Sequence, residues 1–123
     1  MKLPWRFAGL KTTSGNVLKD YVSKDKKFQA RVDAFLRRQK WKPLPWTLPD
    51  YRPVGDSVGE LRIDYRNVEY RFYGFYGPEQ VQFTVMLIGD EKKGQQKDIK
   101  AAKKIMTQIN LMNGKPEVEN YDV

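Results

Sequence analysis

Two arginines in the middle of the chain are the residues whose spacing best suits chemistry on a phosphate. Residues 60–65 and 68–76 alternate between apolar and polar side chains, which predicts two strands. Arg66-Asn67 between them predicts a two-residue hairpin turn. In such a hairpin Arg62 and Arg71 lie on the same, non-core face of neighbouring strands, as cross-strand or diagonal neighbours. Two guanidinium groups placed in this way can clamp a phosphate bidentately.

Other side chains on that face decide what the arginine pair does. Tyr73 and Phe75 share the face, where they can stack on bases, and cations interleaved with exposed aromatic rings are what an RNA site needs. Glu60 and Glu69 share it as well and can neutralise the arginines within the protein. The pattern therefore leaves two readings open, a phosphate clamp and an internal ion-pair network.

The composition excludes several kinds of site. The chain has no cysteine and no histidine, so disulfides, thiolate zinc sites, imidazole bases and Ser-His-Asp triads are excluded. Proton transfer then falls to Lys, Tyr, Asp or Glu, or to a partner molecule. The Walker, GxGxxG and HExxH motifs are also missing, and we expect no metal and no cofactor.

The net charge of +8 lies entirely in the first part of the chain. Residues 1–50 hold 12 basic and 4 acidic residues, whereas residues 51–123 hold 11 of each. An excess of this kind can face a polyanion, and solvated lysines on a soluble helix explain it as well. An anionic membrane fits less well, because the basic helix lacks tryptophan and a wide apolar face. The basic residues that we assign to RNA binding are Lys24, Lys27, Arg31, Arg37, Arg38 and Lys97.

The length of 123 residues and the 40% hydrophobic content favour one domain with one core. The patterns predict a strand over 5–12, helices over 17–22 and 24–40, a meander over 60–65, 68–76 and 81–88, and a helix over 98–112. Ser23 is the expected cap of the second helix. We therefore predict an α+β fold: a small antiparallel-dominated sheet (first strand plus three-strand meander) packed against two N-terminal helices and one C-terminal helix.

Apolar residues at helical spacing mark the buried faces of the two longer helices. In the second helix the stripe consists of Phe28, Val32, Phe35 and Leu36. In the last helix it consists of Ile99, Ala102, Ile105, Met106, Ile109 and Met112.

Two segments do not fit this pattern of helices and strands. Residues 41–57 contain four prolines and read as a long irregular loop: a polyproline II ligand, a substrate-side flap, or a loop whose aromatic residues cover one edge of the core. Residues 115–123 read as an acidic tail after a domain over 1–114. We find neither a signal peptide nor an apolar run long enough to span a membrane, so we expect a cytoplasmic protein with no membrane partner.

Four segments of the chain resemble the motifs of one known family, in the same order. Residues 15–22 (GNVLKDYV) resemble its opening G-x-x-v-x-e-F-l, and residues 59–62 (GELR) resemble its W/Y-E-L-R. Residues 70–73 (YRFY) resemble its Y-R-I/V-x-Y. Lys92-Lys93, followed by Gln, Lys and a helix with Ile99 and Ala102, resembles its F-x-K-K-t-x-k-t-P-x-x-E-I-x-x-A. The chain therefore resembles the RelE/ParE toxin superfamily, in particular its phage-derived HigB-like branch.

The resemblance implies the toxin of a type II toxin–antitoxin pair: a metal-independent, ribosome-dependent mRNA endoribonuclease. The ribose 2′-hydroxyl attacks the phosphodiester, and the protein supplies cations at the developing charge. Carried over by position, Arg62 and Arg71 clamp the phosphate, Lys92 and Lys93 add charge, and a lysine or Tyr73 moves protons. The implied partners are mRNA, the ribosome and a small antitoxin protein, often one with a helix-turn-helix.

The chain departs from the family pattern at one place. Where the family usually has H-x-F-x-K-K, residues 88–93 read IGDEKK, so Ile88 and Asp90 occupy the histidine and aromatic positions. Two acids beside the lysines lower the local potential. This motivates an alternative function: the same fold without nuclease activity, either a gyrase-targeting toxin or a phage protein that binds RNA or a partner.

Overall fold

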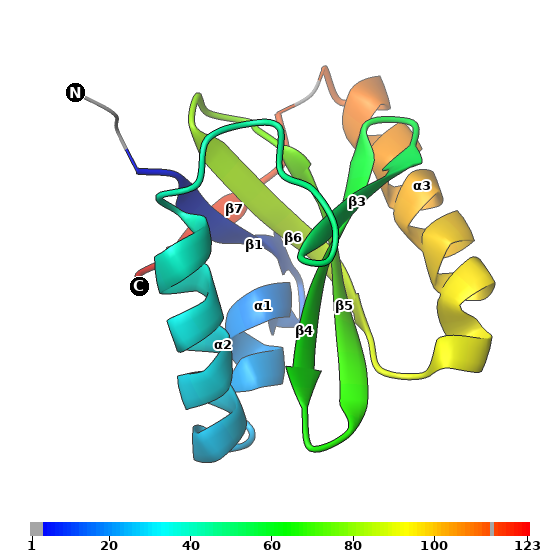
Figure 1. Ribbon diagram of the computed structural model, residues 1–123. Helices are drawn as coiled ribbons and strands as arrows, with labels where there is room; N and C mark the ends of the chain where they lie inside the picture. The colour runs from blue at the N-terminus through cyan, green and yellow to red at the C-terminus, as the bar shows by residue number, and fades with distance from the viewer. Residues whose placement is uncertain (1–3, 114) are drawn as a thin grey trace.

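The computed structural model describes residues 4–113 and 115–123 as a mixed sheet with helices on both of its faces (Figure 1). Its seven strands are β1 (Arg6–Thr12), β2 (Gly15–Asn16), β3 (Tyr51–Gly55), β4 (Val58–Tyr65), β5 (Val68–Tyr76), β6 (Gln82–Gly89) and β7 (Val118–Tyr121). Its helices are α1 (Val17–Val22), α2 (Lys26–Gln39), the short 3-10 helix η1 (Lys92–Gly94) and α3 (Gln95–Leu111).

The sheet has the strand order β2-β1-β6-β5-β4-β3, and β7 pairs with β1. Strands β1 and β6 are parallel, and every other pairing in the described chain is antiparallel. The predicted sequence of one strand, two helices, a meander and a final helix is confirmed, as is the antiparallel-dominated α+β sheet. The predicted sheet of four strands is wrong, because three short strands add to it.

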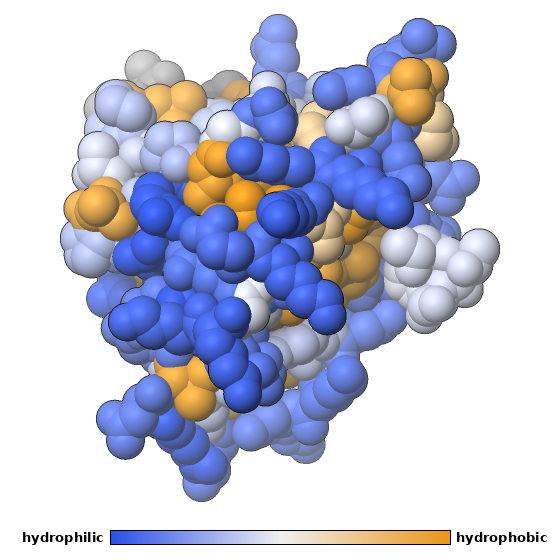
Figure 2. Space-filling view, turned by 90° about the vertical axis from the view of Figure 1, so that its right-hand side faces the viewer, coloured by the Kyte–Doolittle hydropathy of each residue, from blue (hydrophilic) through white to orange (hydrophobic). Residues whose placement is uncertain are grey.

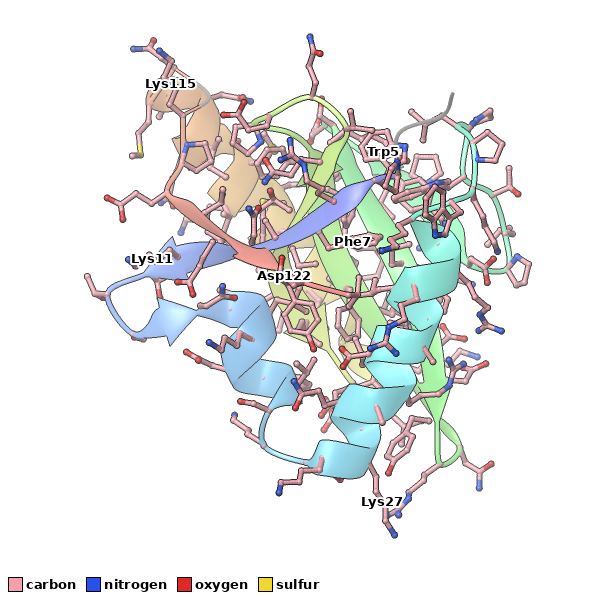
Figure 3. The ribbon with its side chains drawn as sticks, turned by 90° about the vertical axis from the view of Figure 1, so that its left-hand side faces the viewer. Trp5, Phe7, Lys11, Lys27, Lys115 and Asp122 are labelled. Carbon is pink, nitrogen blue, oxygen red and sulfur yellow. The ribbon has the colours of Figure 1, made fainter. Side chains whose placement is uncertain are left out.

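Two of the added strands lie in segments for which we predicted no strand, the Pro-rich loop and the acidic tail. β3 forms the end of the Pro-rich segment and pairs with β4, and Trp46 and Tyr51 from this segment are buried. These two rings cover one edge of the core, as one of the three readings predicted, although Trp41 is 59% exposed. β7 lies along β1 (Figure 3), so residues 118–121 belong to the sheet and not to a separate acidic tail.

The N-terminal helices begin at side-chain caps. The Asn16 carboxamide oxygen accepts hydrogen bonds from the backbone N–H groups of Leu18 and Lys19, each at 2.9 Å. Asp25, and not the predicted Ser23, caps α2 by accepting from Lys27 N at 2.9 Å. A carboxylate is the stronger acceptor here, and it also complements the helix dipole.

The sheet separates two hydrophobic cores. On one face α1 and α2 cover Leu61, Ile63 and Phe72, and the predicted stripe of α2 is buried there. On the other face α3 covers Tyr73 and Phe75 with the side chains of Ile99, Ala102, Met106 and Ile109. The sequence prediction that this second face lies outside the core is therefore wrong for its apolar half. Met112, predicted to be buried, is 61% exposed because α3 ends at Leu111.

We expect the C-terminal strand to be essential for stability, because Tyr121 packs in the core of α1 and α2 and its hydroxyl donates to Asp33. Tyr121→Ala should lower the free energy of unfolding by about 3–5 kcal/mol. Tyr121→Phe keeps the ring and should cost only about 1 kcal/mol. Urea unfolding measures both, and a Tyr121→Ala protein as stable as the wild type would show that β7 is dispensable.

Candidate functional site

The β4–β5 hairpin places the two arginines directly opposite each other. Arg62 is the register partner of Arg71, and the predicted turn at Arg66-Asn67 is confirmed, because Tyr65 pairs with Val68. Both turn residues have positive φ, which matches the primed hairpin turns that follow the twist of the strands. A short turn of this kind fixes the register, and the period of two then puts both guanidinium groups on one face.

Glu60 anchors the arginine pair from inside the protein. Its side chain is fully buried, and its carboxylate accepts hydrogen bonds from Arg62 Nε at 2.8 Å and from Gln95 Nε2 at 3.1 Å. Arg52 Nε lies 3.6 Å from the same carboxylate. Burial alone would raise the pKa of Glu60, but the hydrogen bonds from Arg62 and Gln95 outweigh it, so its pKa is lowered. Glu60 therefore stays ionised and joins β3, β4 and α3.

Glu69 closes the pair from the solvent side. Its Oε1 lies 2.9 Å from an Nη of Arg71 and 3.8 Å from Arg62 Nε. Arg71 is almost completely buried, whereas the Glu69 side chain is 38% exposed. Glu69 thus contacts both arginines, whereas the buried Glu60 pairs with Arg62 and not with Arg71. Both acids neutralise the pair, as the interpretation of an internal ion-pair network predicts.

A polar cleft of about 380 Å³ opens in front of the arginines. Its walls come from the β4–β5 hairpin on one side and from the segment between β6 and α3 on the other. The residues that line it are Arg62, Asn67, Val68, Glu69, Arg71, Asp90, Lys92 and Gln95. Three of the predicted catalytic cations therefore share one cavity, which is of a size to hold a phosphate and part of a nucleotide.

The segment that carries Lys92 is positioned by a close approach of α3 to the sheet. Gly89 ends β6, and any side chain there would collide with the Asp98 carboxylate at the start of α3. This contact places η1 beside the hairpin. Lys92 and Lys93 are both exposed in η1, and of these two only Lys92 lines the cleft.

Tyr73 does not reach the cleft surface. Its side chain is fully buried beneath α3, and Phe75 is nearly so. Burial and the negative charge of Glu60 raise the pKa of Tyr73. The expectation that these two rings are exposed to stack on bases is therefore wrong, and the Tyr73 hydroxyl is held in its neutral form.

The basic residues of α2 lie apart from the cleft, on the helix that covers the opposite face of the sheet. Figure 3 shows Lys27 pointing away from the protein at the start of α2. Lys24, Arg37 and Arg38 are also exposed, while Arg31 is partly buried and donates from Nε to the Asp64 carbonyl at 3.0 Å. Lys97 is exposed on the first turn of α3. The two groups of basic residues thus form separate surfaces.

Asn67, Asp90 and Gln95 line the cleft without having been chosen from the sequence. Asp90 was noted only as an acid in an unexpected place; it accepts a hydrogen bond from the Tyr21 hydroxyl at 3.3 Å. Burial and this carboxylate raise the pKa of Tyr21 to about 12. The position of Asn67 could be predicted from the hairpin turn, whereas no sequence pattern predicts that Gln95 contacts Glu60.

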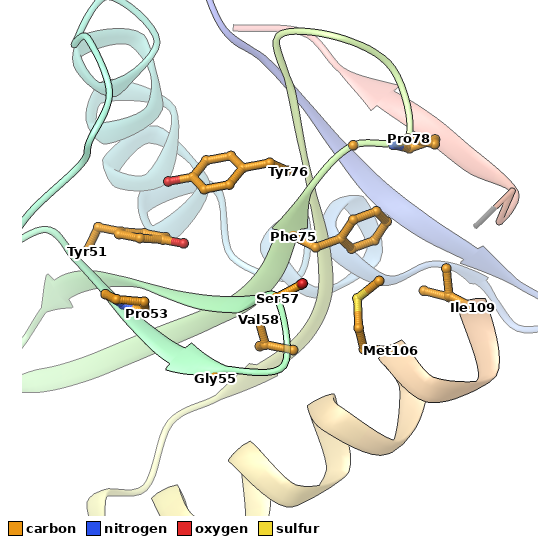
Figure 4. A pocket seen from close by; sticks show the side chains of 11 residues that line it. Tyr51, Pro53, Gly55, Ser57, Val58, Phe75, Tyr76, Pro78, Met106 and Ile109 are labelled. Carbon is orange, nitrogen blue, oxygen red and sulfur yellow. The ribbon is translucent and has the colours of Figure 1, made fainter. Parts of the chain in front are cut away.

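A larger cavity, of about 550 Å³, lies between the β3–β4 hairpin and the C-terminal half of α3 (Figure 4). Phe75, Met106 and Ile109 line it together with the tyrosines Tyr51 and Tyr76. None of its lining residues carries a charge, so it does not resemble a phosphate site. Figure 2 shows the face over α3, where hydrophilic side chains surround small apolar patches.

The chain matches no protein-family model, no curated protein and no solved structure. Within residues 4–113 and 115–123, no three Asp or Glu side chains converge to form a group that could hold a metal ion. The helices in this part of the chain are too short or too polar to cross a membrane.

Glu60 should contribute strongly to stability, because its buried carboxylate is the hydrogen-bond acceptor of Arg62 and the ion-pair partner of Arg52. We expect Glu60→Ala to lower the free energy of unfolding by about 3–5 kcal/mol at pH 7. A carboxylate with a lowered pKa stabilises the fold above its ordinary pKa of 4.5 and loses this effect as the pH falls below it. The difference between wild type and variant in urea unfolding should therefore shrink in acid.

The exposed Glu79 provides a control, since Glu79→Ala should change stability by no more than about 0.5 kcal/mol. Equal effects of the two substitutions would contradict the role of Glu60.

Proposed function

We propose that this protein is a RelE/ParE-like toxin that cleaves mRNA on the ribosome without a metal ion. The observation that carries the proposal is the direct opposition of Arg62 and Arg71 in a cleft that also contains Lys92. In this proposal the protein acts in the cytoplasm, where its substrate is translated, and a cognate antitoxin protein covers its basic surface.

The cleft contains the groups that cleavage by a 2′-hydroxyl requires. Attack of the 2′-oxygen on phosphorus breaks the bond to the 5′-oxygen and leaves a cyclic phosphate and a 5′-hydroxyl end. The added negative charge develops on the phosphoryl oxygens, where guanidinium groups stabilise it. The carboxylate of Asp90 borders the same cavity and can accept the proton of the 2′-hydroxyl, and Lys92 can donate one to the leaving oxygen. Tyr73 is buried and takes no direct part in this scheme.

The exposed cations of α2 suit a second task, which is attachment to ribosomal RNA. Lys27, Arg37 and Arg38 are exposed on α2, and Lys24 is exposed in the turn before it; none of the four lines the cleft. Positive residues that contact phosphates provide affinity that does not depend on sequence. The proposal thus divides the work between a broad basic surface and a small reactive cleft.

A second candidate function is binding without cleavage. It is favoured by the two carboxylates of Glu69 and Asp90 among the cations, and by the buried position of Tyr73. In this case the fold serves either a gyrase-targeting toxin or a protein that binds RNA or a partner. Gyrase-dependent DNA damage with intact mRNA would select the first variant, and RNA binding without cleavage would select the second.

The decisive experiment is tightly controlled expression of wild type and Arg62→Ala/Arg71→Ala, with transcript 5′ ends mapped. We expect growth arrest and new 5′-hydroxyl ends at codons in the ribosomal A site. Each lost phosphate donor should lower the cleavage rate by about 10²–10³-fold, so the double variant should be inert.

A variant with the same loss of charge, Lys11→Ala/Lys19→Ala, removes two exposed lysines away from the cleft and should remain toxic. Normal growth with intact transcripts and soluble, folded wild-type protein would exclude the nuclease.

The role of α2 can be tested separately by the salt dependence of RNA binding. For Lys24→Ala/Lys27→Ala we expect the slope of log K against log salt to fall by about 0.7 for each lost phosphate contact. Fluorescence anisotropy with a labelled single-stranded RNA measures the slope. An unchanged slope would mean that these lysines are merely solvated.

A further inference from the structure

We propose that Glu69 is the internal occupant of the phosphate site, and that a substrate phosphate binds by displacing it. Glu69 then acts as a specificity-determining residue that admits phosphates and rejects carboxylates. This inference rests on the proposed function, because it assumes that Arg62 and Arg71 receive a phosphate.

The position of the Glu69 carboxylate supports this role. Oε1 lies 2.9 Å from Arg71 Nη2 and 3.8 Å from Arg62 Nε, so one oxygen atom bridges the two guanidinium groups. A phosphate oxygen that used both arginines would have to occupy the same place. The carboxylate and the ligand therefore compete for the same donors.

The contrast with Glu60 shows which of the two acids can move. Glu60 is fully buried and accepts from Arg62 and Gln95, so displacing it would leave a buried charge without partners. Glu69 is 38% exposed at the rim of the cleft, and water can solvate its carboxylate once it leaves the arginines. Glu60 therefore stays bound to Arg62, whereas Glu69 can leave the two arginines and return to them.

Because Glu69 is part of the chain, it competes more effectively against a carboxylate ligand than against a phosphate ligand. Glu69 presents its carboxylate at the high effective concentration of an intramolecular group. An external carboxylate offers the arginines nothing that Glu69 does not already provide. A phosphodiester offers further oxygens, which can reach Lys92 and Gln95 on the opposite wall while Arg62 and Arg71 are engaged. The cleft should therefore bind RNA in preference to acidic peptides.

The test compares binding of a fluorescein-labelled single-stranded RNA and of polyglutamate to wild type and variants. Glu69→Gln removes the competing charge and keeps the shape of the side chain. It should tighten RNA binding by about fivefold, the equivalent of a partly exposed ion pair, and should raise polyglutamate binding by a larger factor. Glu69→Asp keeps the charge but shortens the reach, and it should give an intermediate gain.

Asp64 provides a matched control on the same hairpin. It is the register partner of Glu69 and is exposed, and its carboxylate makes none of the ion pairs found in the described chain. Asp64→Asn removes the same unit of charge without freeing an arginine, so it should change RNA binding by less than about twofold. Gains of equal size for Glu69→Gln and Asp64→Asn would reduce the effect to net charge and overturn the inference.

The same measurements separate this inference from the proposed clamp. RNA binding that is lost in Arg62→Ala/Arg71→Ala but unchanged in Glu69→Gln keeps the clamp and rejects the internal competitor. Binding that is the same in wild type and Arg62→Ala/Arg71→Ala rejects both. Polyglutamate that binds the wild type as tightly as RNA also overturns the inference, and it would identify an acidic protein as the ligand. Circular dichroism and urea unfolding establish that every variant is folded.

Discussion

Two guanidinium groups face each other across β4 and β5, and the surrounding carboxylates stabilise this close approach of like charges. Arg62 and Arg71 are register partners, and Arg71 is almost fully buried. Like charges directly opposite each other destabilise a sheet unless acids or an anion intervene. Glu60 and Glu69 provide that neutralisation from the inner and the outer side. The cost of keeping Glu60 ionised in the interior is offset by hydrogen bonds from Arg62 of β4 and Gln95 of α3 and by the ion pair with Arg52 of β3.

The position of α3 divides one face of the hairpin into a core and a cleft. Towards one end of the strands the helix covers Tyr73 and Phe75 with apolar side chains. Towards the turn it leaves Arg62 and Glu69 within reach of solvent. Gln95, the first residue of α3, lies at the boundary and bonds to Glu60, so the ion-pair network and the helix position depend on each other. The polar cleft is therefore a consequence of where the second core ends.

The sequence predicts those features that depend on local periodicity. The alternation of β4 and β5 and the short turn at Arg66-Asn67 predict Arg62 and Arg71 on one face as cross-strand or diagonal neighbours, and the structure shows them directly opposite each other. A period of two does not say whether the second face of a sheet is covered, so the burial of Tyr73 was missed. Edge strands such as β3 and β7 are short and give a weak sequence pattern. In β3 the residue Pro53 is more typical of a loop than of a strand, so the strand was not predicted. The hydrogen bond between Gln95 and Glu60 joins residues 35 positions apart, so no local sequence pattern predicts it.

The net positive charge of the chain and the polar cleft lie on different surfaces. The cleft cations Arg62, Arg71 and Lys92 are equal in number to the carboxylates of Glu69 and Asp90 in the cleft and of Glu60 buried behind it. The cleft therefore exerts little net attraction on a distant polyanion. The excess charge of the chain lies in residues 1–50, and α2, with five basic residues and one acidic residue, carries half of it. With a Debye length of about 8 Å at physiological salt, the surface of α2 attracts a nucleic acid only once the molecules are close, and it does so without regard to sequence. If a phosphate displaces Glu69 as proposed, selection comes from the cleft, where the ligand gains only what its oxygens add beyond the carboxylate that it replaces. A neutralised clamp is thus compatible with binding to phosphate, and it gives a physical reason for acids to stand beside the cations of such a site.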